Sequence, residues 1–466
     1  MTTKLYVENI DTYNELTSKK YLIKENASIQ EVKNGIILPP KKQSTSTRNG
    51  IFAGGVATKN FEFVSGMKRH GRAAGNYSCL ESYKVEESVI YIDEEVIFGG
   101  IIIKHFGHAI LEDLSRLWYI VKHKKDTRRV CFVCYQQICE YHYKLFELIG
   151  LTRDRVVIID KPTQFKKIIV PDETIHSWYG YKKEYNIIYD EIKRKIKPKK
   201  YKKVYFTRTG LNDSFDVNEE FFEKFYKKQG YKIVSPEKLS LEDQIAYAAG
   251  AEELVTTLGT LSHFGLFMDY GAKLVIYNRT LKNKLTPQYI INEARKLNVI
   301  YIDALLELLP VEHTGGLVLM YPTKYFLNYI NDNNIDYHKE INKIDKAQII
   351  LTYLENYAKN YSYPDRYFSI ENYDLYDVIN GLSTMLNQSP VIKENMFPKK
   401  RNIHLKRYWI KKSKELELNI QELTKELENT KKELEEEKKK NKNVTASFSW
   451  KITKPLRTIK RKIKRK

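Results

Sequence analysis

The sequence of 466 residues predicts an α/β protein with two doubly wound domains, a short coiled coil and a basic amphipathic C-terminal tail. Three observations lead to this fold class. Residues 89–170 alternate short β-branched runs with helical patterns, which is typical of a mainly parallel sheet covered by helices. Residues 204–277 repeat the alternation. From about residue 406 onward, heptad spacing and then a cluster of cations replace it.

The first predicted domain covers residues 1–197. The strands expected in it are SVIYI, VIFGGIII, VCFVCY, VVIID and KIIV, and the expected helices are residues 108–123, 140–150 and 182–196. The last helix is charged and runs into a lysine- and proline-containing segment, residues 197–200, which we interpret as the linker to the next domain.

The second predicted domain covers residues 198–330. Its elements are expected in the order VYFTR, a helix from Asn218, YKIVS, a helix from Ser240, ELVTT, a helix from Ser262, and KLVIY. Strands that alternate with helices in this way build a second parallel sheet. Residues 331–405 are mixed and mostly helical, and they contain no motif that we can interpret.

The segment VTTLGTLSHFGLFMDYGAKLVIY predicts an anion site in the second domain. A turn at Gly259 and Thr260 leads into a helix that we expect to open near Ser262, and the unpaired N–H groups of a helix start bind phosphates. Arg208 ends the strand VYFTR, and it converges with this helix start on one diphosphate. These residues indicate a nucleotide-type ligand. The alternative is an ordinary βαβ unit with a surface arginine.

A second candidate site follows the glycine-containing strand of the first domain. A helix that starts near Gly107 places His108, Glu112, Ser115 and Arg116 on one face, by steps of three and four. A histidine in the first turn lies near the positive end of the helix dipole, which favours the neutral imidazole that a general base needs. Glu112, one turn on, would orient the ring. The alternative is a surface histidine that pairs with a glutamate.

The C-terminal part has two patterns. A heptad seam predicts a coiled coil over residues 406–442, and a homodimer through it, with a single solvated helix as the alternative. Residues 443–466 contain nine Lys or Arg and no acid from Lys451 onward, with aromatic and aliphatic residues on one side. This pattern predicts that residues 447–466 bind an anionic membrane surface; a disordered polybasic tail and nucleic-acid binding are the alternatives. The residues that carry the two patterns are Leu416, Ile420, Leu423, Leu427, Thr430 and Leu434 for the seam, and Phe448, Trp450, Ile452, Leu456, Ile459 and Ile463 for the tail.

Composition limits the remaining possibilities. The net charge of +21 favours an anionic partner. The N-terminus shows no apolar signal segment and no apolar run is long enough to cross a bilayer, so we expect a cytoplasmic protein with peripheral membrane contact. Cys131 and Cys134 form one CxxC inside an expected buried strand, without a second pair of zinc ligands. The lysine-, isoleucine- and tyrosine-rich composition suggests a bacterium with an AT-rich genome.

Several segments resemble the family 61 glycosyltransferases, a group that includes plant xylan-decorating enzymes and many bacterial polysaccharide-synthesis proteins. GHAILEDLSRLW resembles the family's H-F-x-x-E-x-x-P-R-L segment, VYFTRTG resembles its strand ending in Ser-Arg, and Asn218-Glu219 resembles its N-E helix start. KIVSPEKLSLEDQIAYAAGAEELVTTLGTLSHFGLFM resembles the stretch with Pro-Glu, a glutamine, an alanine and H-G-A-G-L-x-N-L-L-F-M. The resemblance covers about residues 90–280.

The resemblance implies a GT-B architecture, with two Rossmann-like domains facing across a cleft, and inversion at the anomeric carbon. It implies that the donor is a nucleotide sugar. Because the sequence contains no Asp-x-Asp triplet that could hold a metal ion on a diphosphate, we expect no metal cofactor. The resemblance assigns His108 as the base, helped by Glu112. The substrate-binding residues that it implies are Arg116, Arg208, Asn218, Gln244 and Gly259. The predicted helix start adds Thr260 and Ser262 to these, with His263 next to them.

The sequence also departs from the family pattern. Leu258 stands where the family has histidine, residues 260–262 replace Ala-Gly-Leu, and Ser115 replaces proline. His263 would serve in place of the missing histidine. We therefore expect an inverting glycosyltransferase of the bacterial capsular or exopolysaccharide branch, which acts on a glycan or lipid-linked acceptor at the inner face of the cell membrane and binds no nucleic acid. The alternatives are a catalytically silent coiled-coil scaffold and a nucleic-acid-binding α/β protein.

Overall fold

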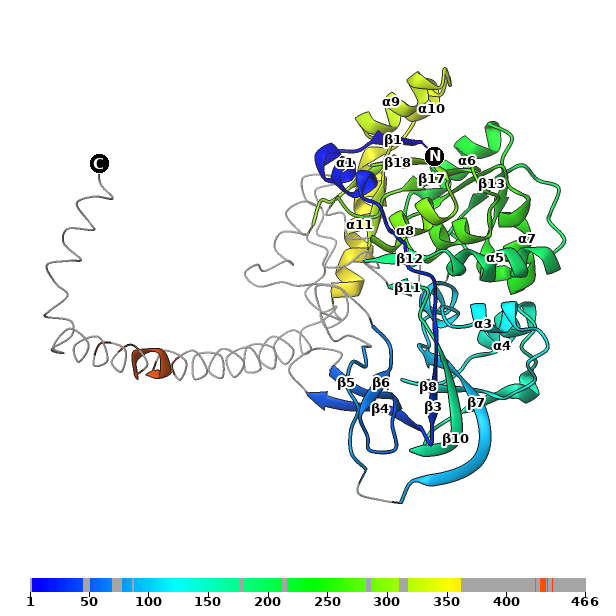
Figure 1. Cartoon of the computed structure of the whole chain (residues 1–466). Helices are drawn as coiled ribbons and strands as arrows, with labels where there is room; N and C mark the ends of the chain where they lie inside the picture. The colour runs from blue at the N-terminus through cyan, green and yellow to red at the C-terminus, as the bar shows by residue number, and fades with distance from the viewer. Residues whose placement is uncertain are drawn as a thin grey trace, which may run out of the picture. The chain divides into compact units, whose positions relative to one another are not determined.

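The computed structural model describes residues 2–44, 51–68, 78–85, 88–176, 179–211, 216–281, 286–309 and 317–361, together with residues 424, 428–432, 434 and 438. The chain divides into two compact units, Met1–Val391 and Ile392–Lys466. In the first unit the described residues form a mixed α/β fold with two large sheets, as the sequence predicts at this level. Figure 1 shows β7, β8 and β10 in one half of this unit and β13, β17 and β18 in the other.

The first sheet has the strand order β6-β5-β4-β10-β7-β8-β9, and β3 also pairs with β10. The strands of residues 89–170, β7 to β10, pair with one another in parallel, as predicted for that range. No pairing was predicted from the sequence for β3 to β6, and these strands pair antiparallel. No helix of the described residues separates β3 to β6 along the chain, and strands joined without a crossover pair antiparallel. The strands are β3 (Ile29–Lys33), β4 (Ile36–Ser44), β5 (Ile51–Ala57), β6 (Phe63–Ser65), β7 (Ile90–Ile102), β8 (Val130–Cys134), β9 (Val156–Ile158) and β10 (Thr163–Pro171).

The second sheet has the order β1-β18-β17-β16-β13-β15, and every pair in it is parallel. Its strands are β1 (Thr3–Tyr6), β13 (Lys203–Phe206), β15 (Lys232–Val234), β16 (Glu253–Thr257), β17 (Lys273–Tyr277) and β18 (Asn298–Ile302). β1 pairs with β18, so the N-terminal strand, which we expected in the first domain, completes the second sheet. Periodicity marks a strand but does not say which sheet it joins.

The second sheet reverses its winding at one point. From β13 the chain goes to β15 on one side and then to β16 on the other side of β13. In open parallel sheets, ligands bind outside the carboxyl ends of the strands at such a switch point. The helices that connect these strands are α6 (Glu219–Lys228), α7 (Leu241–Gly250), the 3₁₀ helix η4 (Thr260–Phe267) and α8 (Thr286–Ala294).

Helix α5 (Glu184–Lys195) lies between the two sheets and packs against α3, α4, α7 and η4 (Figure 1). One hydrophobic core joins residues from both halves, including Ile110, Phe146, Tyr189, Phe264 and Ile290. The helix expected over residues 108–123 is instead three pieces: α2 (Phe106–His108), a π-helical turn η1 (Ala109–Asp113) and α3 (Trp118–Lys122). The helices expected at 140–150 and 182–196 are confirmed as α4 (Glu140–Leu148) and α5.

Two small sheets and several helices complete the described part. The small sheets are β11-β12-β2 and β14-β20-β19. The bounds are α1 (Ile10–Ser18), β2 (Leu22–Ile23), β11 (Ile175–His176), β12 (Gly180–Lys182), β14 (Asp216–Val217), β19 (Leu305–Leu306), β20 (Val318–Met320), α9 (Lys324–Asp332), α10 (His338–Ile341) and α11 (Lys346–Tyr361), with 3₁₀ turns η2 (Arg153–Arg155) and η3 (Pro236–Lys238).

The second unit is described only in part. Residues 424, 428–432, 434 and 438 are helical, and Leu434 of the predicted seam is 52% exposed in the single chain. The seam positions Leu416, Ile420, Leu423 and Leu427 and the whole tail 443–466 lie outside the described residues, so the coiled coil and the membrane-binding tail stay predictions. In the segments that the structure describes, no helix is long and apolar enough to cross a bilayer.

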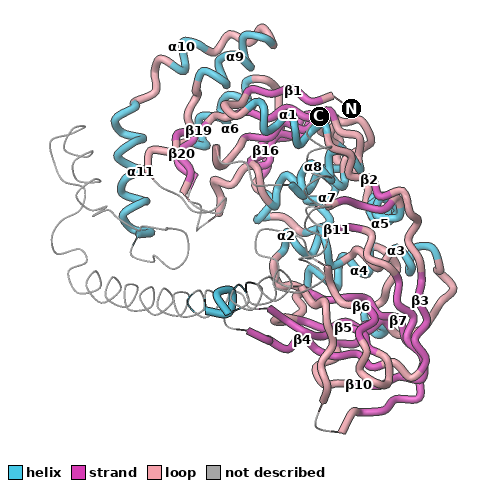
Figure 2. The backbone as a smooth tube through the Cα atoms, turned by 60° about the vertical axis from the view of Figure 1, so that its left-hand side comes forward, coloured by secondary structure: helices cyan, strands magenta, loops and turns pink. Residues whose placement is uncertain are grey.

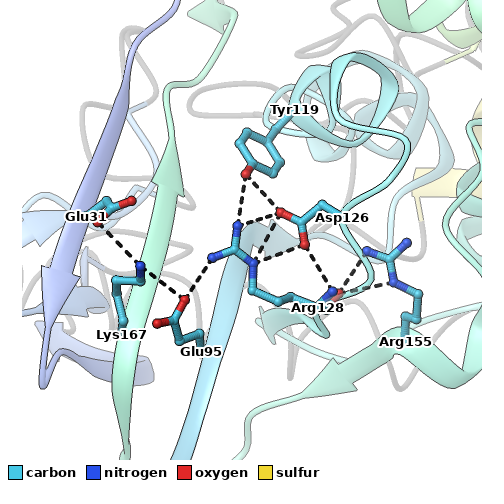
Figure 3. A network of polar contacts seen from close by, with 7 residues as sticks. All are labelled: Glu31, Glu95, Tyr119, Asp126, Arg128, Arg155 and Lys167. Atoms are coloured by element: carbon cyan, nitrogen blue, oxygen red, sulfur yellow. Dashed lines mark hydrogen bonds and ion pairs between the residues drawn. The ribbon is translucent and has the colours of Figure 1, made fainter.

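A polar network braces the first sheet, away from the carboxyl ends of its parallel strands (Figure 3). The Arg128 guanidinium donates to the carboxylates of Asp126 and Glu95, and Lys167 joins Glu95 to Glu31 on the neighbouring strand β3. Hydrogen bonds from Arg128 hold the pKa of Asp126 down to about 2. The network thus ties β3, β10 and β7 to the turn that follows α3.

Candidate active site

Two loops meet where the first sheet faces the second. One follows β7 and carries α2, and the other follows β16 and opens η4; Figure 2 shows α2 at this junction. A Cβ added to Gly107 would lie 2.8 Å from the Thr260 hydroxyl oxygen, so only glycine allows the two loops to approach this closely. The rings of Phe106 and Phe264 lie 6.3 Å apart beside this contact. The structure therefore brings together the two candidate sites that the sequence predicts separately.

His108 and Glu112 form the pair that their spacing predicts. The His108 Nδ1 atom lies 2.5 Å from Glu112 Oε2, and the side chains are 20% and 4% exposed. A carboxylate that accepts a hydrogen bond from Nδ1–H places the lone pair of the neutral ring on Nε2. A general base needs this tautomer, and His108 is the more exposed residue of the pair.

The backbone that holds this pair is a π turn and not the regular helix that we expected. A dipole argument does not apply to a helix of three residues, so the orientation of His108 depends on Glu112 instead. The hydroxyls of Tyr185 and Tyr189 on α5 donate to the carbonyl oxygens of Leu111 and Ile110, at 2.8 Å and 2.6 Å. These two buried tyrosines supply donors to carbonyls of the widened turn and fix its position.

Arg116 does not share the face of His108, contrary to the helical prediction. Its guanidinium is 3% exposed, donates to the carbonyl oxygens of Gly66 and Pro171 and to Ser65 Oγ, and lies 3.6 Å from Glu173. Burial raises the pKa of Glu173 to about 7. Arg116 therefore ties the loops after β6 and β10 to the π turn.

Two further histidines surround His108. The ring of His105 lies 5.2 Å from that of His108, and His263 enters from η4 of the second half. Burial, and then the proximity of His108, lower the pKa of His263 to about 4, so this ring is neutral near pH 7. Its Nδ1 atom is buried and finds no hydrogen-bond partner in the described part of the chain. The sequence analysis missed His105, although the H-F-G-H spacing was a signal for it.

The glycine loop differs from its prediction in one respect. Its helix is 3₁₀ and begins at Thr260, not near Ser262, and Gly259 has φ of 134°, a conformation that favours glycine. Ser262 Oγ accepts from Gly259 N–H at 3.2 Å and lies 2.7 Å from Gln288 Oε1, fully buried. Ser262 therefore shapes the loop from inside. Among the described residues no hydrogen bond uses the N–H groups of Thr260 and Leu261, which are the donors that remain for an anion.

Arg208 lies at the carboxyl end of β13, as predicted, next to the switch point. Its Nε donates to Asp216 Oδ2 at 2.8 Å, and Arg279 Nη2 donates to Asp216 Oδ1 at 2.7 Å. Burial, and then the proximity of Arg279, lower the pKa of Arg208. Glu219 accepts from the N–H of Arg208 at 3.1 Å, and burial raises its pKa to about 8. Asp216 and Arg279 were not predicted from the sequence, and Glu219 was not predicted to be a buried acid. A signal for Arg279 was available, because the polar pair Asn278-Arg279 directly follows the strand KLVIY.

The other two predicted residues bond to the protein's own backbone. Asn218 takes a left-handed conformation at the start of α6, with φ of 69°, and its Nδ2 donates to Met320 O at 3.0 Å. Gln244 lies in the first half of α7 and its Nε2 donates to Leu239 O at 3.2 Å. Both side chains therefore support loops at the carboxyl edge of the second sheet.

The described residues offer no metal site, and a surface hollow lies away from the two loops. Within the described segments no group of three His, Cys, Asp or Glu is arranged to hold a metal ion, and the four cysteines, all described, form no disulfide. The surface hollow, of about 430 Å³, is lined by Lys202, Glu252 and Gly271 near the amino ends of β13, β16 and β17. We place the site at the opposite edge, because the titratable groups and open donors gather there.

The fold and this site define an α/β protein with a candidate anion site at the switch point of a parallel sheet. Residues 106–276 match the family model described as Glycosyltransferase 61. The matched span contains both loops, from His108 to His263, and it supports glycosyltransferase family 61 and, in general, glycosyltransferase activity. A comparison with curated proteins finds no match for this chain.

Proposed function

We propose that this protein is an inverting glycosyltransferase with a GT-B arrangement, which moves a sugar from a nucleotide donor to a cell-surface glycan such as a capsule or exopolysaccharide. The observation that carries the proposal is the His108–Glu112 pair, held against the glycine loop of the nucleotide-type sheet at Gly107 and Thr260. A base and an anion site have to lie this close because a glycosyl transfer joins an acceptor hydroxyl to a carbon that bears a diphosphate.

His108 acts as the general base in the proposed reaction. Its Nε2 removes the proton of the acceptor hydroxyl while that oxygen attacks the anomeric carbon, and the bond from this carbon to the diphosphate oxygen breaks with its electron pair. A single displacement of this kind inverts the anomeric configuration. Glu112 holds the ring and stabilises the imidazolium that forms, through the Nδ1 contact of 2.5 Å.

The departing diphosphate meets donors from two strands in this proposal. Arg208 supplies a guanidinium, and the open N–H groups at Thr260 and Leu261 supply dipoles at the start of η4. The neutral side chain of His263, which lies on η4 near His108, contacts the nucleotide sugar. These groups replace a metal ion, so the proposed enzyme needs no metal cofactor.

We also propose that the protein acts at the inner face of the cell membrane on a glycan or lipid-linked acceptor. The support is the sequence pattern of residues 447–466, and two tails on a dimer formed through residues 406–442 would bind by avidity. Co-sedimentation with anionic vesicles, for the full chain and for a truncation at Asn443, tests this location. Equal binding by both proteins would exclude the tail as the anchor.

A catalytically silent scaffold is the second candidate. The departures at Leu258 and at residues 260–262 favour it, because Ser262 turns inward and leaves fewer polar side chains in the glycine loop. The deciding experiment is a screen of UDP, GDP and CDP sugars by thermal shift, followed by transfer assays with the donor that binds. Proton NMR of the product then tests inversion. Absence of binding by all donors would favour the scaffold.

A further inference from the structure

Three side chains from separate segments meet over the carboxyl edge of the second sheet. Arg208 follows β13 and Arg279 follows β17, and β16 lies between these two strands. Asp216 begins β14, where its backbone is fixed by pairing with β20. Each arginine donates to a different oxygen of the Asp216 carboxylate, at 2.8 Å and 2.7 Å. The carboxylate thus joins the two guanidiniums near the end of the strand that feeds the glycine loop.

The three side chains differ in their exposure. Asp216 is 0% exposed and Arg279 is 5% exposed, whereas 20% of Arg208 reaches the surface. Only the Nε of the Arg208 guanidinium is bound to Asp216, and in the described part of the chain neither of its terminal amino groups takes part in a hydrogen bond. The buried pair therefore holds one edge of Arg208 and leaves the other edge available.

The cluster contains two guanidiniums that bond to the same carboxylate. The nearby Glu219 is largely uncharged near pH 7 because burial raises its pKa to about 8. Both guanidiniums lie at the switch point, where an open parallel sheet binds its ligand. An arginine fork that is fixed in advance loses less side-chain entropy when it binds a planar or forked anion.

We propose that Asp216 and Arg279 are positioning residues that hold the guanidinium of Arg208 by one edge, so that its two terminal amino groups bind a diphosphate. This inference rests on the proposed function, because the diphosphate is that of the nucleotide donor. Arg279 acts through Asp216 and not by contact with the ligand, since its side chain is almost fully covered.

Isothermal titration calorimetry with UDP, GDP and CDP and with the matching monophosphates tests the inference. Asp216→Asn keeps the side-chain volume and adds one net positive charge, so simple attraction predicts tighter binding of the diphosphate. Positioning predicts the reverse: we expect the best-bound diphosphate to bind about tenfold more weakly, with little change for its monophosphate. Arg279→Gln should give the same selective loss. Asp126→Asn, which removes another arginine-paired carboxylate from the brace in Figure 3, is the matched control and should change neither affinity.

A double-mutant cycle isolates the action through Arg208. On an Arg208→Ala background, Asp216→Asn should change diphosphate affinity by less than about twofold. Unchanged or tighter binding by Asp216→Asn, or an equal loss on both backgrounds, would overturn the inference. If Asp216→Asn fails to fold, Arg279→Gln gives the same decision. Loss of binding in Arg208→Ala alone would overturn only the positioning roles, whereas absence of diphosphate binding by the wild-type protein would overturn the proposed function as well.

Discussion

Two groups of charged side chains differ in their roles. One is the polar network around Arg128 on the first sheet, called the brace, and the other is the cluster of Arg208, Asp216 and Arg279 on the second sheet. In the brace, Arg128 and Lys167 form ion pairs with Glu31, Glu95 and Asp126, mostly at partly exposed positions, and Arg155 donates to the Arg128 carbonyl oxygen (Figure 3). In the cluster, Arg208 and Arg279 share Asp216 in a buried setting. A network of partly exposed ion pairs gives modest stability. The buried cluster fixes Arg208 at the switch point of the parallel sheet, and this difference predicts where mutations affect function.

The largest expected effect is at His108, which lies outside the brace, in the loop that contacts the glycine loop of the second sheet. His108→Ala removes the base, so kcat should fall by about 10² to 10⁴-fold while donor binding is retained. His123→Ala, whose ring stacks on Tyr119 beside the brace at 4.2 Å, is the matched control and should keep its turnover. Steady-state kinetics with a donor identified by the binding screen measures both. Near-normal turnover of His108→Ala would remove this residue from the mechanism.

The second effect concerns the free energy of unfolding at acidic pH, to which His263 near the site and Asp126 in the brace contribute at different pH values. His263 has a pKa of about 4 in the folded protein against 6.5 for an exposed ring. Below pH 6.5 the unfolded chain binds a proton that the folded protein does not, so the free energy of unfolding falls between about pH 6.5 and 4, by up to about 3 kcal/mol. Asp126 in the brace, with a pKa of about 2 against 3.8, loses its contribution only as the pH falls from about 3.8 to 2.

Urea denaturation at several pH values, for the wild-type protein and His263→Gln, measures this effect. Glu219 contributes the opposite slope between about pH 4.5 and 8, because its pKa is raised, so the two proteins are compared by difference. The variant should lose less stability than the wild type between pH 6.5 and 4. Parallel curves would show that His263 does not titrate in this window.

The third effect tests the cluster itself. Arg208→Ala should weaken binding of the nucleotide diphosphate by roughly 1.5–3 kcal/mol, the contribution of a hydrogen bond to a charged group. Arg208→Lys should restore only part of it, because an ammonium lacks the bidentate fork. Arg128→Ala in the brace should leave the affinity unchanged. Equal affinities of the Arg208 variants and the wild type in calorimetry would place the diphosphate elsewhere.

The smallest effect concerns the helix between the sheets. Tyr189→Phe removes the donor to Ile110 O and loosens the π turn that carries Glu112, so kcat should fall by up to about tenfold, the equivalent of one neutral hydrogen bond. Donor affinity should not change. Tyr226→Phe removes a similarly buried hydroxyl, which pairs with Tyr277 at 2.8 Å, and should leave kcat unaffected. An equal change of kcat in both variants would mean that general destabilisation explains the result.

Much of the local structure was predictable because it depends on neighbours in the chain. The strands β13, β15, β16 and β17 and the helices α4 to α7 lie close to their predicted ranges. The contact of His108 with Glu112 follows from a spacing of four residues, even though the turn between them is a π turn. Arg208 at a strand end was equally visible. The break in the helix over residues 108–123 was not, because the partners of Arg116 and of the widened turn lie on β10, the loop after β6, and α5.

The sequence by itself determined the α/β class, the βα series of the second sheet, and the two loops that carry His108 and Gly259. Only the tertiary structure decided that these loops meet at Gly107 and Thr260, that β1 completes the second sheet, and that Asp216 joins two arginines. The physical reason is the range of each interaction. Periodicity and capping report contacts within one or two turns, whereas Asp216 and Arg279 are 63 residues apart and meet because the strand order places the ends of β13 and β17 on either side of β16.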